Sequence, residues 1–460
     1  MKKKIFEYVE NQKVSKIIII LCFVVFVLQA LFFALTIKES LPPDEAYHLK
    51  LSQVYSKTLS RPSNSEETYY IGQIEDTAFL YHWISGRIIN LKDAFFPALS
   101  DLVTLRIVSV LTGVSSIFIA YQIIKLLTED KLAQTLLVIM LTNTLMFVFI
   151  SGGVSYDPLT TLFSLLIIYF VLKLFKHKTI ENMFFFLFFL LLGALTKITL
   201  PPFAFIVILF LVIHEWKYRG KYLESLKEFW KRKKVLTILL ALVILILVVL
   251  NTNLYIANFI KYKNMIPECT QVMEFDDCMK SAEYSFHHGL VESAPPRNER
   301  VTIYWYFHHW VYYQIESLYG VLAHTSMILP HKGVLCFYGI FIISITLFIR
   351  NFDFKSSEQK FLSFLIVSYL FVLFFFLNYS TYIDQGILQS GIQGRYLFPI
   401  LVPIYVLIAS NLSYIRRSYL KVGLFLLFSS IFIYWNIPFF LSNVTNEWFL
   451  TESWILDILH

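Results

Sequence analysis

The chain has 460 residues, of which 57% are hydrophobic and only 15% are charged. Soluble globular proteins carry about 25% charged residues, so this composition excludes an ordinary soluble domain and indicates a membrane protein with several spans. The formal net charge of +7 is divided among short basic clusters between apolar runs. Such clusters are a signal of membrane topology, and they do not form the long basic face that a nucleic-acid partner would need.

The first apolar run, at residues 16–37, follows the basic N-terminus Lys2–Lys4. It is longer than the apolar core of about 7–15 residues in a signal peptide, and no clear cleavage site precedes Pro42, so we interpret it as a retained first transmembrane helix. Apolar runs of about 17–25 residues predict transmembrane helices. We therefore predict an all-α polytopic membrane protein, one integral membrane domain over residues 1–460, with about eleven spans near residues 16–37, 103–126, 132–150, 158–175, 183–197, 198–214, 235–256, 333–350, 361–378, 396–414 and 422–441.

The basic connections predict the sidedness of these spans, because Lys and Arg are enriched in short cytoplasmic loops. With the N-terminus in the cytoplasm, the inner connections all carry Lys or Arg: 125–131, 173–178, 216–234, 350–360 and 414–421. The predicted outer segments are 39–101, 151–157, 197–202, 257–332, 378–395 and the residues after 442. This assignment places six charged residues from four separate connections on the outer side: Asp44, Glu45, Asp157, Lys197, Asp384 and Arg395. A shared outer cavity would explain this better than unrelated loop charges, because side chains at the membrane surface are poorly solvated.

Two of the outer segments are long. Residues 39–101 contain the stretches 47–59 and 79–91, which predict short amphipathic helices on the membrane surface. Residues 257–332 contain Cys269 and Cys278, which are either a disulfide in an oxidising compartment or two unpaired thiols. They also contain the aromatic run 304–313, which predicts an interfacial anchor or, alternatively, a groove for a lipid carrier.

The string Leu41-Pro42-Pro43-Asp44-Glu45-Ala46-Tyr47-His48 comes directly after the first span. Carboxylates beside a bilayer are expensive unless the protein uses them. In a purely structural interpretation, Asp44 caps a helix and Glu45 is solvated. In a functional one, Asp44 and His48 lie one helical turn apart, where a carboxylate and its partner could act as a general base or bind a divalent metal.

Three further residues have the same two interpretations. Asp157 precedes a proline, so it is either a helix cap or a second carboxylate of the outer cavity. Lys197 and Arg395 either reach to the lipid headgroups or bind a phosphate, and Gly394 would allow a ligand to approach Arg395 closely. The chain has no Walker loop, no GxGxxG and no serine nucleophile elbow, which argues against nucleotide hydrolysis.

The acidic pair Asp44-Glu45 in the first outer segment resembles the mark of the GT-C superfamily of membrane glycosyltransferases. Protein O-mannosyltransferases and the aminoarabinose transferases that modify lipid A belong to this superfamily. The fuller string with Pro42-Pro43 and His48, together with Gln393-Gly394-Arg395-Tyr396-Leu397-Phe398-Pro399, is most similar to a bacterial family of GT-C-like membrane proteins. Asp157 and Lys197 also fit the general pattern.

The resemblance implies a cell-envelope glycosyltransferase that moves a sugar from a polyprenyl-phosphate donor to a glycan, lipid or protein acceptor, with inversion, at the outer face of a bacterial plasma membrane. Asp44 would be the general base, and Glu45 or Asp157 would orient the acceptor or assist. Lys197 and Arg395 would bind the donor phosphate. The remaining expected substrate-binding residues are His48, Gln393 and Tyr396.

Nothing in the sequence requires a cofactor, and a divalent metal is the one alternative to consider. Two other functions compete with the transferase. A transporter or flippase for lipid-linked saccharides would show mid-span charges and inverted repeats, of which the sequence has few and none respectively. A polymerase or ligase of the same polysaccharide pathway would use the same outer cavity.

Overall fold

The computed structural model describes residues 12–323, 326–389 and 391–450, and these residues are helical or in loops apart from two isolated β-bridges. Lys2–Lys4, on which the predicted orientation partly depends, lie outside the described residues. Nine helical segments of the described chain are long and apolar enough to cross a membrane. They are α2 (Gln12–Thr36), α5 (Asp101–Leu127), α8 (Asp157–Lys176), Leu200–Arg232 with α10 (Leu200–Glu215) and α11 (Arg219–Arg232), Lys234–Tyr262 with α12 (Lys234–Asn251) and α13 (Ala257–Tyr262), α18 (His331–Asn351), Ser357–Gln385 with α19 (Ser357–Val372) and α20 (Ser380–Gln385), Gly394–Ser413 with α21 (Phe398–Ser413), and Ser418–Asn443 with α22 (Ser418–Tyr434) and α23 (Ile437–Asn443).

The two remaining predicted spans correspond to less regular elements. The run at 132–150 is a broken span, in which α6 (Lys131–Thr142) and α7 (Leu145–Ser151) meet at an angle of 61°. The run at 183–197 is α9 (Ile180–Ala194), a shorter apolar helix of 15 residues. The structure thus confirms the all-α polytopic membrane fold, with nine candidate spans in the described chain and one bent pair.

The break between α6 and α7 has a local cause in polar side chains. Asn143 Nδ2 donates to the Ile139 carbonyl, and Thr144 Oγ1 donates to the Met140 carbonyl. The Asn143 N–H still donates to the Ile139 carbonyl, whereas the Thr144 N–H no longer reaches the Met140 carbonyl, which the Thr144 hydroxyl satisfies instead. Such side-chain bonds are how a helix tolerates a break at membrane depth. The bent pair is buried except at Lys131, and α6 packs against α2, α5, α21 and α22 at the centre of the bundle.

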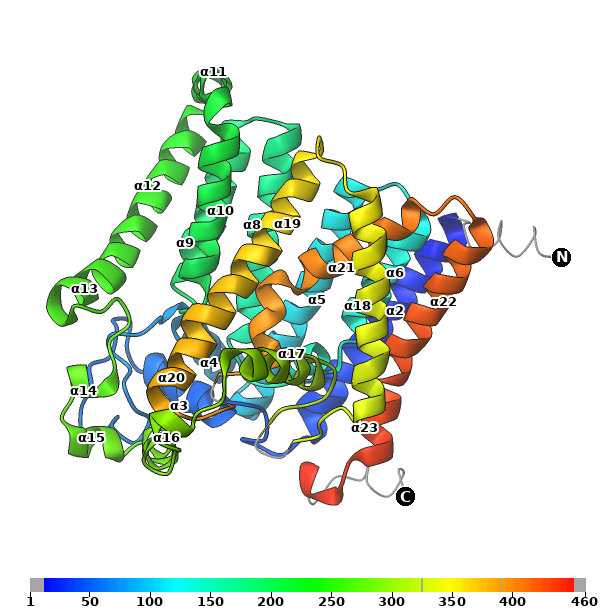
Figure 1. Ribbon diagram of the computed structural model, residues 1–460. Helices are drawn as coiled ribbons and strands as arrows, with labels where there is room; N and C mark the ends of the chain where they lie inside the picture. Colours follow the sequence, from blue (N-terminus) through cyan, green and yellow to red (C-terminus); the bar gives the residue numbers. More distant parts are fainter. Residues whose placement is uncertain (1–11, 324–325, 390, 451–460) are drawn as a thin grey trace.

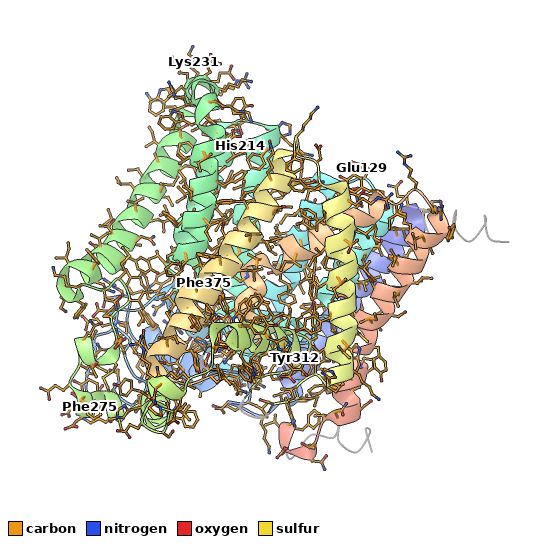
Figure 2. All side chains as sticks on the ribbon, in the orientation of Figure 1. Glu129, His214, Lys231, Phe275, Tyr312 and Phe375 are labelled. Carbon is orange, nitrogen blue, oxygen red and sulfur yellow. A yellow bond between two sulfur atoms is a disulfide. The ribbon has the colours of Figure 1, made fainter. Side chains whose placement is uncertain are left out.

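The outer segments gather at one end of the bundle, and the basic α11 lies at the other (Figure 1). Residues 39–101 form α3 (Glu45–Ser56) and α4 (Leu80–Phe95), which confirms the two predicted short helices. Residues 257–332 include α14 (Cys269–Val272), α15 (Phe275–Met279), α16 (Ala282–Glu292) and α17 (Ile303–Tyr319). In Figure 2, Lys231 and Glu129 lie toward the α11 end, and Phe275 and Tyr312 lie toward the end with α14–α17.

The aromatic run forms most of α17, which lies across the lower ends of the spans in Figure 1. Tyr306, Trp310 and Tyr313 are buried against the bundle, whereas Tyr304, Trp305 and Phe307 are exposed. One helix face is therefore packed and the other presents large aromatic rings, as expected for a helix in the membrane interface.

Candidate active site

Four charged side chains meet where the spans end beneath the outer segments. Arg395 Nη2 lies 2.7 Å from Asp44 Oδ2, and Arg395 Nη1 lies 3.5 Å from Asp157 Oδ2. Lys197 Nζ completes the series through an ion pair with Asp157 Oδ1. The four residues come from four separate connections, and their two carboxylates balance their two cations.

These residues border or underlie a cavity of about 930 Å³, whose lining includes Asp44, His48, Lys197, Gln393, Arg395 and Tyr396. The side chain of Asp44 is 32% exposed, whereas those of Asp157, Lys197 and Arg395 are only 2–4% exposed. Asp44 is therefore the carboxylate of this group that a ligand in the cavity can reach. Asp157 lies behind the two cations, where it neutralises them.

The backbone of Asp44 is in the left-handed region, with φ at +59°. Asp adopts this conformation more readily than most residues, because its short side chain can form local bonds. Asp44 occupies the N-cap position of α3, but its side chain makes no capping hydrogen bond. The carboxylate instead extends to Arg395, so a residue that could have been a simple cap is directed at the cavity.

The charges around Asp44 favour its ionised form. Burial alone would raise the pKa of the Asp44 carboxyl, but Arg395, His48 and Lys197 together hold this pKa below its usual value. Burial lowers the pKa of His48 to about 4, against the opposing effect of Asp44 and Asp157. The site therefore contains an ionised carboxylate beside a neutral imidazole at neutral pH.

Glu45, next to Asp44 in sequence, lies in a different environment. Its carboxylate accepts hydrogen bonds from Arg106 Nε at 2.8 Å and Nη2 at 2.7 Å, and from the backbone N–H groups of Val154 and Ser40. Arg106 also donates to the carbonyls of Ala34, Ile37 and Lys38 at the end of α2. Both side chains are buried, and together they join α2, α3, α5 and the connection before α8. Glu45 does not line the cavity.

Lys197 is held between two aromatic rings. Its Nζ lies 4.4 Å from the centre of the Tyr156 ring and 5.0 Å from that of Tyr396. Burial lowers the pKa of Lys197, although Asp157 opposes this effect. The rings and the Asp157 carboxylate, which accepts a hydrogen bond from Nζ, stabilise this buried ammonium group.

Arg395 owes its position to Gly394. A Cβ on Gly394 would collide with the backbone of Leu318 in α17, and the Gly394 N–H donates to Ser317 Oγ at 2.9 Å. This close approach places Arg395 against the cavity wall. Gln393 Oε1 then accepts from Arg395 Nε, and the Tyr369 hydroxyl donates to the Tyr396 carbonyl.

His48 pairs with His82 of α4, with its Nδ1 2.9 Å from His82 Nε2. One of these two nitrogens donates and the other accepts. The second nitrogen of each ring, Nε2 of His48 and Nδ1 of His82, has no hydrogen-bond partner in the described chain. Within the described residues, no three His, Cys, Asp or Glu side chains converge in the manner of a metal site. The donor set around Asp44 and His48 therefore does not fit a metal centre, and no step proposed below involves one.

The structure thus brings together Asp44, Asp157, Lys197 and Arg395, with His48, Gln393 and Tyr396 in the same cavity wall. Asp384 is not part of this wall. Sequence reasoning missed Arg106 and His82. Arg106 carried a usable signal, because it is a charged residue one turn inside an apolar span, where an unpaired charge is expensive. His82 carried none.

The arrangement of the helices is that of a GT-C-fold membrane protein. Three solved structures share it: ArnT from Cupriavidus metallidurans in the apo state (14% identity, TM-score 0.50, covering 88% of this chain and 62% of that one), the oligosaccharyltransferase of Archaeoglobus fulgidus in the apo form (12%, 0.51, 93% and 56%), and the same enzyme tethered to an acceptor peptide (12%, 0.50, 95% and 58%). The chain spans less than two thirds of each of these proteins, and at such identities the likeness shows the fold alone.

The chain belongs to the DUF2142 family of predicted membrane proteins, whose model matches residues 48–404. No curated protein matches the sequence. The expected resemblance to the GT-C superfamily is therefore confirmed at the level of fold.

Proposed function

We propose that this protein is a glycosyltransferase that moves a sugar from a polyprenyl-phosphate donor to an acceptor hydroxyl. The observation that carries the proposal is the site itself, in which an accessible carboxylate, Asp44, lies 2.7 Å from a buried guanidinium at the wall of a cavity. Transfer from a lipid phosphate needs these two groups together. One accepts the proton of a weak nucleophile, and the other binds the phosphate as it becomes a leaving group.

Lys197 and Arg395 supply the phosphate site. In the structure their charges are matched by those of Asp157 and Asp44. A phosphate in the cavity takes the place of Asp44 on Arg395, because a guanidinium binds phosphate oxygens in the same planar geometry as carboxylate oxygens. Asp157 remains behind the cations and keeps the site close to neutral before the donor arrives.

The reaction is a direct displacement at the anomeric carbon. The acceptor oxygen forms a bond to this carbon as the bond between the carbon and the phosphate oxygen breaks. The electron pair of the broken bond leaves with the polyprenyl phosphate, which Lys197 and Arg395 stabilise. The acceptor proton passes to Asp44, and the configuration of the anomeric carbon is inverted.

Glu45 acts in this scheme as a positioning residue. Its bonds to Arg106 and to the Val154 and Ser40 N–H groups fix the first turn of α3, from which Asp44 extends. His48 borders the same cavity and faces the Tyr156 ring at a centroid distance of 4.3 Å. It contributes a neutral imidazole beside Asp44, held in place by His82.

The Cys269–Cys278 disulfide supports an active site on the outer face. Disulfides persist in oxidising compartments and are rare in the cytosol, and this one lies on the same side of the bundle as the cavity, with Cys269 in the cavity wall. The basic α11 lies at the opposite end. We therefore place the N-terminus in the cytoplasm of a bacterial cell and the cavity outside the plasma membrane.

The test uses purified protein in lipid nanodiscs and a panel of C55 polyprenyl-monophosphate monosaccharides with radiolabelled sugars. We expect release or transfer of the sugar from one donor, and loss of donor binding in Arg395→Met and Lys197→Met. Arg297→Met, which changes an exposed arginine outside the cavity, is the matched control. If no donor binds the wild-type protein, the proposal is wrong. Passage of an intact donor across vesicles without any acceptor would favour the transporter instead.

A further inference from the structure

A second accessible carboxylate, Glu283 of α16, borders the same cavity as Asp44. Other charged residues of the wall have partners within the chain. Asp44, Lys197 and Arg395 form ion pairs, and Asp76 accepts a hydrogen bond from the Tyr262 hydroxyl at 2.9 Å. Glu283 makes no hydrogen bond or ion pair within the described part of the chain, and the charges of Asp44 and Arg395 act on it only at longer range. It is therefore an unused acceptor facing a cavity.

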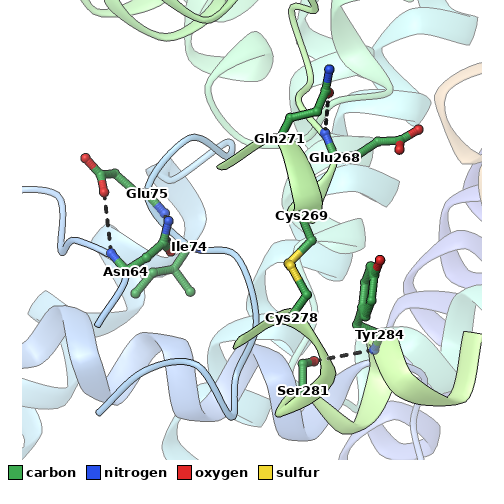
Figure 3. Close-up of a disulfide and its surroundings, with 9 residues drawn as sticks. All are labelled: Asn64, Ile74, Glu75, Glu268, Cys269, Gln271, Cys278, Ser281 and Tyr284. Atoms are coloured by element: carbon green, nitrogen blue, oxygen red, sulfur yellow. Dashed lines mark hydrogen bonds between the residues drawn. A yellow bond between two sulfur atoms is a disulfide. The ribbon is translucent and has the colours of Figure 1, made fainter. Parts of the chain in front are cut away.

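The position of Glu283 is fixed by its local structure. Ser281 caps α16 by accepting from the Tyr284 N–H, and the Cys269–Cys278 disulfide holds the two short helices that precede it (Figure 3). Gly72 packs against Ser281 so closely that a Cβ there would lie 3.2 Å from Ser281 Oγ. Glu283 thus sits on an anchored element and not on a free loop.

The surroundings of Glu283 favour a ligand that donates hydrogen bonds. Burial, and then the Asp44 carboxylate, raise the pKa of Glu283 above its usual value, against the opposing effect of Arg395. Two carboxylates facing one cavity repel each other unless a donor lies between them. In the same wall, the Gln73 Nε2 amide, a donor, has no acceptor in the described chain, so a ligand group that accepts as well as donates, such as a hydroxyl, suits this wall.

Aromatic side chains complete this part of the wall. Tyr284 and Phe286 of α16 line the cavity beside Glu283, and Tyr255 lines it from the neighbouring span. Carboxylate and amide groups next to aromatic rings suit a pyranose, which presents hydroxyls at its edge and an apolar C–H face. The phosphate-binding cations belong to the Arg395 part of the wall, so the α16 part is free for the second substrate.

We propose that the α16 wall is the acceptor subsite, that the acceptor group is a carbohydrate, and that Glu283 accepts a hydrogen bond from one of its hydroxyls while Asp44 faces the attacking one. This inference rests on the proposed function, since it assigns the second substrate of the same reaction. It makes Glu283 a determinant of acceptor binding that donor binding does not need.

The test measures saturation-transfer NMR from the protein in nanodiscs to methyl glycosides of neutral hexoses, in the presence of C55 polyprenyl monophosphate. Wild type and Glu292→Gln are expected to bind at least one glycoside. Glu292 is the matched control, because it lies on the same helix but is exposed and outside the cavity. Glu283→Gln should weaken glycoside binding by about tenfold or more, through loss of a hydrogen bond to a charged group.

Binding of the polyprenyl phosphate, measured in the same samples, separates the two proposals and also serves as the folding control for Glu283→Gln. Unchanged phosphate affinity with weakened glycoside binding supports the inference. Equal glycoside binding in Glu283→Gln overturns it. If the wild-type protein binds the polyprenyl phosphate but no glycoside, the acceptor-subsite inference is wrong and the proposed function is still supported. If the wild-type protein binds neither, both proposals are wrong.

Discussion

Asp44 and Glu45 are neighbours in sequence but have opposite surroundings. Asp44 is accessible from the cavity, whereas Glu45 is buried against Arg106. The sequence predicted that this acidic pair matters, but it could not divide the roles. The division depends on the left-handed backbone at Asp44 and on a partner, Arg395, that lies 351 residues away. Neither the backbone conformation of Asp44 nor its distant partner can be predicted from the residues around position 44.

Removing the charge of Glu45 should destabilise the fold. In Glu45→Gln the buried Arg106 keeps its charge and loses its counterion, which costs about 3–5 kcal/mol in comparable buried pairs. Thermal unfolding in detergent should show a clearly lower midpoint than in Glu39→Gln, an exposed control. The double variant Glu45→Met/Arg106→Met should recover part of the loss, because no unpaired charge remains. An unchanged midpoint in Glu45→Gln would contradict this account.

The buried pair His48–His82 should make the protein less stable in acid. Burial lowers the pKa of His48 to about 4 and that of His82 well below its usual value, so the folded state binds fewer protons than the unfolded state. Stability is then fully present above the ordinary histidine pKa of about 6.5 and is lost as the pH falls toward 4. The unfolding midpoint measured from pH 8 to pH 4.5 should fall less steeply in His48→Gln/His82→Gln. Parallel slopes would show that the pair is not the cause.

At the scale of elements, hydropathy predicted the helices well and their irregularities poorly. Every predicted run falls on a helix, because about 20 apolar residues in a row have few other structures in a bilayer. The bend between α6 and α7 was missed because Asn143 and Thr144, not Pro or Gly, produce it. Charge bias could predict that Asp157, Lys197 and Arg395 lie at the same end of the bundle, but their mutual contacts follow from helix packing.

The disulfide should stabilise only the α14–α16 segment. Closing such a short loop typically contributes about 2–4 kcal/mol. In Cys269→Ser/Cys278→Ser, hydrogen exchange over residues 265–290 should become faster, while the spans keep their protection. Cys22→Ser and Cys336→Ser, which remove the unpaired cysteines, should change nothing in this segment. A loss of protection throughout the bundle would show that the disulfide holds more than this segment.

At the scale of the whole molecule, the sequence predicts one cytoplasmic and one outer end, and the structure separates the same segments in space. The basic α11 is at one end, and α3, α4 and α14–α17 are at the other. In a background without free cysteines, a cysteine at Lys221 should react with a membrane-impermeant maleimide only after the cells are permeabilised. A cysteine at Ser285 should react in intact cells. The reverse pattern would invert the orientation and place the cavity in the cytoplasm.

The central claim is that Asp44 is the base of a lipid-phosphate sugar transferase and that Arg395 exchanges this carboxylate for the donor phosphate. The most direct measurement compares single-turnover sugar transfer and affinity for C55 polyprenyl monophosphate in wild type, Asp44→Asn and the exposed control Asp384→Asn. Asp44→Asn should lose transfer by about 10²-fold or more and bind the phosphate at least as tightly as wild type, because Arg395 no longer has a competing carboxylate. Transfer at the wild-type rate, or phosphate binding lost together with transfer, would contradict this account.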